Sequence, residues 1–87
     1  AAVKIIPNPA NEDAKLEITI SSTSLITFEI SDAEGKKIAG FSAGQLDAGT
    51  YGWPLLTILN GKFPQPGVYF LNTYFQGKMK VTKFIIR

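Results

Sequence analysis

Apolar and polar residues alternate along most of this chain. In KLEITI, residues 15–20, three apolar side chains share one face, and charged or hydroxyl side chains occupy the other. A period of two is the pattern of a β-strand with one buried face. Similar short segments bounded by turn residues predict seven strands, near residues 2–6, 15–20, 26–30, 37–41, 48–53, 67–75 and 79–86.

Turn residues separate the predicted strands. Pro7 and Pro9 end the first strand, because proline fixes φ and has no N–H group. Residues 55–66 contain an Asn-Gly pair and two further prolines, so we expect a long loop there. Residues 76–78 (QGK) join the last two strands in a hairpin, in which Gly77 is best able to take a positive φ. No window with the 3.6-residue period is long enough to predict a helix.

These features predict an all-β fold for residues 1–87, taken as a single domain: an Ig-like antiparallel β-sandwich of about seven strands. A small closed barrel is the alternative. Trp53 is the only tryptophan, and its size predicts that it fills the space between two sheets. Residues 67–75 are apolar on both faces, so this strand is expected to be central or to contact a partner, for example in a homodimer.

Charge is distributed unevenly although the net charge is only +2. Residues 1–47 carry four lysines and seven acids, a balance of −3, whereas residues 48–87 carry four lysines and one arginine without any acid, a balance of +5. A basic half is either a solvated face or a contact for an anionic partner. No apolar run approaches the ~20 residues of a membrane span. Residues 1–6 lack the pattern of a signal peptide, so export would depend on a signal elsewhere in the protein.

Catalytic chemistry finds little support in these residues. The chain has no Cys and no His, which excludes disulfides, thiolate zinc sites and nucleophile–His mechanisms. Asp32 and Glu34 flank Gly35 in a predicted turn, and their spacing matches no calcium-binding loop. No phosphate-binding glycine motif occurs. We therefore expect no catalytic residue, no cofactor and no metal. Aromatic residues near the C-terminal lysines are expected to pack within the fold, so no nucleic acid partner is predicted.

Six short motifs, in order, resemble one known family. They are IIPNPAN (5–11), DAEGKKI (32–38), AGTYGW (48–53), PGVYF (66–70), GKMK (77–80) and KFIIR (83–87). Together they are similar to the C-terminal sorting domain ("Por secretion tail", type A) of proteins exported by the Bacteroidetes type IX secretion system. The residues after Trp53 depart from the family pattern, since Pro54 and two leucines stand where a polar run is usual.

This resemblance implies a non-catalytic signal domain. It would follow a cargo domain in the same chain, fold in the periplasm and direct the cargo through an outer-membrane translocon to the cell surface or the medium. In most family members a sortase-like protease then removes the domain, and the cargo is joined to anionic lipopolysaccharide.

The terminal hairpin is the predicted recognition surface. We expect Phe84 and Ile86 to point into the core, and Lys83, Ile85 and Arg87 to point outward. A solvated edge strand would carry the same cations, but the resemblance favours a signal. The residues predicted to be read by the translocon are Gly67, Tyr69, Gly77, Lys78, Lys80, Lys83, Phe84, Ile85, Ile86 and Arg87.

Two other functions remain open from the sequence. An Ig-like or fibronectin-like accessory module of a secreted enzyme would bind carbohydrate or protein, with an exposed Trp53 or Tyr51 as the stacking residue. An Ig-like domain of a flagellar hook-capping protein shares the AGTY–W and GVYF features, but would be expected to continue beyond the lysine-rich strand.

Overall fold

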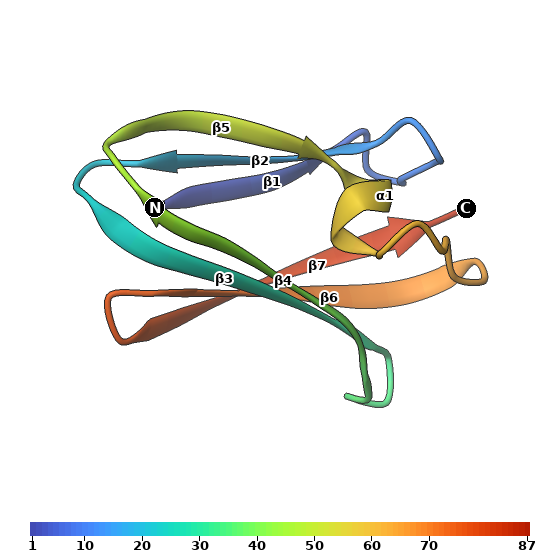
Figure 1. The fold of residues 1–87 in the computed structure, drawn as a ribbon. Coiled ribbons are helices and arrows are strands. Elements are labelled where there is room, and N and C mark those ends of the chain that lie inside the picture. Colours follow the sequence, from blue (N-terminus) through green and yellow to red (C-terminus); the bar gives the residue numbers. More distant parts are fainter.

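The computed structural model describes all 87 residues, which form two stacked antiparallel sheets and one short helix (Figure 1). The elements are β1 (Ala2–Ile6), β2 (Lys15–Ile20), β3 (Ser24–Asp32), β4 (Lys37–Leu46), β5 (Gly49–Pro54), α1 (Leu55–Ile58), β6 (Gly67–Phe75) and β7 (Lys78–Ile86). One sheet has the strand order β1-β2-β5 and the other β4-β3-β6-β7. The predicted Ig-like sandwich of seven strands is confirmed, and the closed barrel is not formed.

The core lies between the sheets and follows the predicted alternation. The inward residues of β2 and β3 are at most 4% exposed: Leu16, Ile18, Ile20, Ile26, Phe28 and Ile30. Leu71 of β6 and Phe84 of β7 complete this layer. Each such side chain stabilises the fold by about 1.5–3 kcal/mol when buried. This layer carries most of the stability of a fold that has no disulfide.

Two segments differ from the sequence prediction. Leu55–Ile58 forms one helical turn where a loop was expected. Its two buried residues, Leu55 and Ile58, are three positions apart, so a single turn covers the core without showing a repeated period. Strand β4 also continues to Leu46, beyond the predicted end at residue 41. A register shift against β3 and the positive φ of 79° at Gly44 interrupt the period-two pattern there.

Trp53 packs between the two sheets, as its size predicted, but near their edge. It lies on β5, at the edge of the three-stranded sheet, and is only half-buried. Its ring packs edge-on against Phe28 and Phe41, with centroids 5.5 and 5.9 Å away, and stacks on Tyr51 at 6.4 Å. The aromatic side chains that are almost completely buried are Phe28 and Phe84, both from the four-stranded sheet.

Two tyrosines fix the starts of strands by the same device. The Tyr51 hydroxyl donates to the carbonyl of Asp47 (2.8 Å), and the Tyr69 hydroxyl donates to that of Gln65 (2.5 Å). A tyrosine that bonds the backbone a few residues upstream is the tyrosine corner of Ig-like folds. In each case a glycine two residues earlier lies against the ring; a Cβ at Gly49 would be 3.8 Å from Tyr51 Cε1. The repeated G-x-Y motif is therefore a structural element of the sandwich.

Candidate protein-interaction site

The β6–β7 hairpin closes through a tight two-residue turn. The two strands pair in unbroken register from Gly67↔Ile86 to Phe75↔Lys78. Gly77 has a φ of 71°, as predicted, but Gln76 also has a positive φ, of 50°. Both central residues of a type I′ turn need a positive φ. The sequence did not predict one at Gln76, because glutamine seldom adopts this conformation. The Gln76 amide Nε2 donates to the Ser22 hydroxyl at 2.9 Å, and this contact ties the turn to the loop between β2 and β3.

Strand β7 has two halves with different surroundings. In residues 84–86, the anchored half, Phe84 and Ile86 are each 1% exposed and the Phe84 ring lies 6.0 Å from that of Tyr69. In residues 78–83, the free half, every side chain except the half-buried Thr82 is exposed. The predicted directions are confirmed: Phe84 and Ile86 point inward, whereas Lys83, Ile85 and Arg87 are exposed.

Residues 8–10 cover the outer edge of the anchored half. The backbone N–H of Ile85 donates to Asn8 Oδ1 (3.1 Å), and the N–H of Ala10 donates to the Ile85 carbonyl (2.6 Å). The N–H of Arg87 then donates to the Ala10 carbonyl (3.1 Å). The PNPA motif therefore holds the end of β7 although it lies more than 70 residues earlier. No signal in the sequence connects these two segments, since only the fold brings them together.

The outer edge of the free half has no such cover. Backbone groups in an antiparallel strand point alternately toward and away from the neighbouring strand. Because the Ile85 backbone points away from β6, the N–H and C=O groups of Met79, Val81 and Lys83 also point away. No backbone hydrogen bond joins these three residues to another segment. In Figure 1 the β6–β7 turn lies below β3.

The outer face of β7 is apolar. Met79 is 55% exposed, Val81 51% and Ile85 41%, which makes half of the six large exposed apolar side chains members of one strand. The half-buried Val68 and Phe70 of β6 lie beside them, opposite Ile85 and Lys83. Such a concentration of exposed apolar side chains marks a contact surface.

The middle of β3, on the same face, is polar. The Glu29 carboxylate accepts a hydrogen bond from the Tyr74 hydroxyl (3.1 Å) and forms an ion pair with the Lys37 ammonium group (3.3 Å). This bond to Glu29 raises the pKa of Tyr74 above its ordinary value of 10.0. These polar groups satisfy one another, so the apolar contact surface of β6 and β7 ends at Tyr74 and Glu29; the exposed Leu25 of β3 lies farther along, near the β6–β7 turn.

The cations of the hairpin have no acidic partner. The ion pairs of the structure are Lys4–Glu17 and Lys37–Glu29, both outside the hairpin. Lys78, Lys80 and Lys83 are exposed, and only Lys80 makes a polar contact, to the carbonyl of Ala1 at 3.3 Å. The surface therefore combines unpaired positive charge with apolar side chains.

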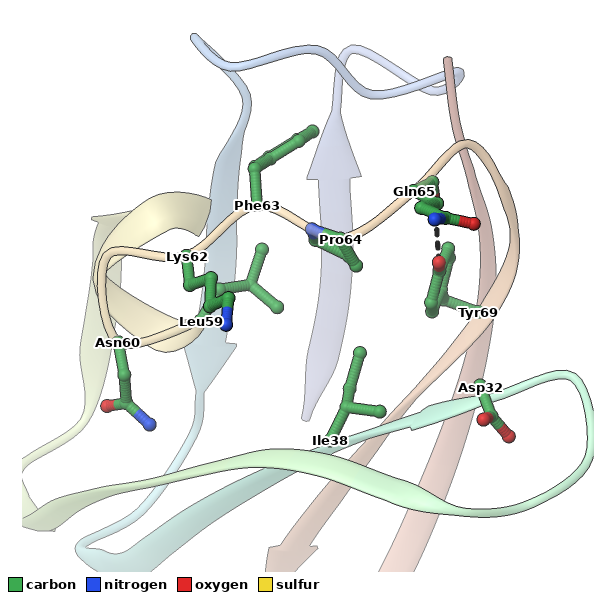
Figure 2. Close-up of a pocket in the computed structure, with 9 residues that line it drawn as sticks. All are labelled: Asp32, Ile38, Leu59, Asn60, Lys62, Phe63, Pro64, Gln65 and Tyr69. Atoms are coloured by element: carbon green, nitrogen blue, oxygen red, sulfur yellow. Dashed lines mark hydrogen bonds between the residues drawn. The ribbon is translucent and has the colours of Figure 1, made fainter.

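One open pocket of about 580 Å³ lies elsewhere, between the loop after α1 and the start of β4 (Figure 2). Two of its polar side chains serve the fold: Asp32 Oδ1 accepts the N–H groups of Glu34 and Lys36, both at 2.9 Å, and the Tyr69 hydroxyl donates to the Gln65 carbonyl. Asp32 thus acts as the predicted turn residue. No three potential metal-ligating side chains gather anywhere in the structure. None of its helices has the length and hydropathy to span a bilayer.

The comparison with protein families decides the assignment. The model described as "Secretion system C-terminal sorting domain" matches residues 4–87. The chain belongs to this family. The predicted relationship to type IX sorting domains is thereby confirmed, and with it a role in type IX sorting, which implies passage to the outer membrane or the cell surface.

Among solved structures the sorting domain is similar to PorZ, described as an essential bacterial surface component of the type-IX secretion system of Porphyromonas gingivalis. The TM-score is 0.65 at 17% identity, which establishes a shared fold. The match covers 98% of this chain but only 11% of the PorZ chain. None of the curated proteins compared with the sorting domain matches it.

The alternative of a carbohydrate-binding module loses its expected platform. Trp53 and Tyr51 are both half-buried and stack on each other, with 16° between their planes. The Trp53 ring also packs against two phenylalanines of the opposite sheet. Neither aromatic ring stands free for a sugar, and the family match favours sorting over a hook-capping role.

Proposed function

We propose that this domain directs a covalently linked upstream cargo protein through the outer membrane, and that the translocon reads the free half of β7 with its outer face. The observation that carries the proposal is the contrast within one strand: residues 78–83 are exposed, cationic and partly apolar, while residues 84–86 are built into the core. A signal of this kind is presented only by the folded domain, because Phe84 and Ile86 set the position of the hairpin.

The role of each predicted site residue follows from its place in this arrangement. Tyr69, Phe84 and Ile86 are buried and position the hairpin, and Gly77 allows its turn. Gly67 begins β6 beside the Tyr69 ring. Lys78, Lys80, Lys83, Ile85 and Arg87 are exposed, so we propose that they contact the translocon.

The later steps of the pathway rest on the family resemblance. The domain folds in the periplasm, and a sortase-like protease removes it after passage. The cargo is then attached to anionic lipopolysaccharide at the cell surface. The domain itself contributes recognition and no catalysis.

Deleting residues 83–87 would not test this proposal cleanly, because it removes two core side chains together with the signal. A sharper test fuses the domain to a reporter cargo in a bacterium with a type IX system and changes only exposed side chains. The variant Val81→Ser/Lys83→Glu should retain the cargo in the periplasm while the purified domain keeps the wild-type melting temperature.

A matched variant, Ile38→Ser/Lys15→Glu, changes an exposed apolar residue to serine and an exposed lysine to glutamate on β4 and β2, away from β7. It should be exported normally. Surface delivery of both variants at the wild-type level would disprove the proposed recognition surface. The proteolytic step is read separately, from the size of the exported cargo.

A further inference from the structure

The free half of β7 is an edge strand with unused backbone groups. Met79, Val81 and Lys83 direct three N–H and three C=O groups away from the sheet, as derived above from the bonds of Ile85. Proteins usually protect such an edge, by covering it or by placing lysines on it. Here residues 8–10 cover the edge beside Ile85 and Arg87, and the cover ends there.

We propose that this open edge accepts an extended segment of a partner protein as an added strand, and that the segment alternates acidic and apolar side chains. This inference rests on the proposed function and names how the translocon partner holds the hairpin. Strand addition lets backbone hydrogen bonds supply affinity, while side chains on the two faces supply specificity.

The side chains of β7 determine the pattern of the added strand. Residues directly opposite each other in neighbouring strands share a face. Acidic residues would therefore lie opposite Lys78 and Lys80, apolar ones opposite Met79 and Val81, and a further acid opposite Lys83. Because the edge is occupied from Ile85 onward, the added strand covers about six residues, roughly 20 Å at 3.4 Å per residue.

A second copy of this chain fits the edge poorly. Antiparallel pairing about Val81 would make Lys80 of one copy the diagonal neighbour of Lys80 of the other, and no acid lies in residues 48–87 to neutralise them. Like charges across neighbouring strands are destabilising. Charge complementarity thus favours an acidic segment from another protein.

The test uses the 87-residue chain and a labelled peptide, Glu-Thr-Val-Glu-Val-Glu, with its reversed sequence as a second orientation. Fluorescence anisotropy should show saturable binding of one orientation that weakens as salt is added. Val81→Pro removes an outward N–H without breaking the β6–β7 ladder, since proline is tolerated at the free side of an edge strand. This variant should bind up to about tenfold more weakly, the effect of losing one backbone hydrogen bond, with an unchanged melting temperature.

Two controls identify the contact. N-methylation of one alternate set of peptide amides should abolish binding, while methylation of the other set should leave it intact, because only one set faces β7. Lys80→Glu should weaken binding about as much as Val81→Pro, whereas Lys15→Glu on β2 should change it less than about twofold. Equal binding to both methylated peptides, or to Val81→Pro and wild type, would show that the edge is not used.

Other occupants give different results and would overturn the proposal. A concentration-dependent dimer in sedimentation velocity that Val81→Pro dissolves would assign the edge to a second copy. Sedimentation with phosphatidylglycerol vesicles, without peptide binding, would assign the surface to a membrane. In the cargo assay, Val81→Pro could be exported normally while Val81→Ser/Lys83→Glu is retained. This result would disprove strand addition but would still support the proposed function. Normal export of all these variants would disprove the proposed function itself.

Discussion

The two halves of β7 share one hairpin and one register, yet they do different things. The anchored half, residues 84–86, contributes two nearly fully buried side chains and has residues 8–10 bonded along its outer edge. The free half, residues 78–83, has neither a covering sheet nor a partner along its edge. The comparison shows that one strand can separate stability from recognition along its length, so a truncation that crosses both halves measures neither.

The largest expected effect comes from truncating one apolar side chain in each half of β7 and comparing the losses of stability. Phe84→Ala should destabilise the domain by about 3–5 kcal/mol, because a fully buried aromatic side chain leaves a cavity. Val81→Ala should cost about 0.5 kcal/mol or less, since the side chain is half in solvent and lies away from the core. Urea unfolding followed by fluorescence gives both values, and similar costs would contradict the division of the strand.

A smaller loss of stability is expected from Trp53, which lies at the edge of the core. Trp53→Ala should destabilise the domain by about 2–3 kcal/mol, less than a buried aromatic because its ring is half exposed. The same unfolding experiment, monitored by circular dichroism, measures this loss. A cost as large as that of Phe84→Ala would show that Trp53 contributes as much to the core as a fully buried aromatic residue.

Removing the cover from the anchored half should make it resemble the free half. Asn8→Ala deletes the acceptor of the Ile85 N–H and should cost about 1 kcal/mol. Amide hydrogen exchange provides the readout. In the wild type Met79, Val81 and Lys83 should exchange fast and Ile85 slowly; in the variant Ile85 should join the fast group. Protection of Val81 in the wild-type monomer would show that the edge is not open.

The smallest expected effect concerns the polar side of the outer face. The bond to Glu29 raises the pKa of Tyr74, so the folded state holds this proton more tightly than the unfolded chain. The resulting stabilisation is present below the ordinary pKa of 10.0 and is lost as pH rises through the raised value. Glu29→Gln should lower the pKa of Tyr74 toward its ordinary value in an NMR titration. An unchanged titration would mean that the hydrogen bond is not maintained in solution.

The sequence predicted those parts of the fold that depend on local alternation. Short segments between turn residues, several of them with a period of two, located all seven strands, and a glycine between two apolar segments located the terminal hairpin. The pattern failed where one turn of helix was too short to repeat, at Leu55–Ile58, and where a bulge at Gly44 broke the alternation of β4. It placed Trp53 between the sheets but did not show how far the ring is buried, because size alone does not reveal that β5 is an edge strand.

The candidate site was only half visible in the sequence. The lysines and the inward direction of Phe84 and Ile86 followed from spacing. The distinction between the free and anchored halves did not, because it depends on Asn8 and Ala10, which reach β7 only through the fold. A hydrogen bond between the Gln76 and Ser22 side chains is likewise a tertiary contact with no local signature.

The bonds between residues 8–10 and the end of β7 also have a mechanical consequence. Tension applied to the chain ahead of Ala2 first acts across the five residue pairs that hold β1 to β2. Once β1 peels away, the same pull reaches Asn8 and Ala10 and is transmitted directly to Ile85 and Arg87. Traction on the connection to an upstream domain is thus mechanically coupled to the hairpin at the opposite end of the sequence.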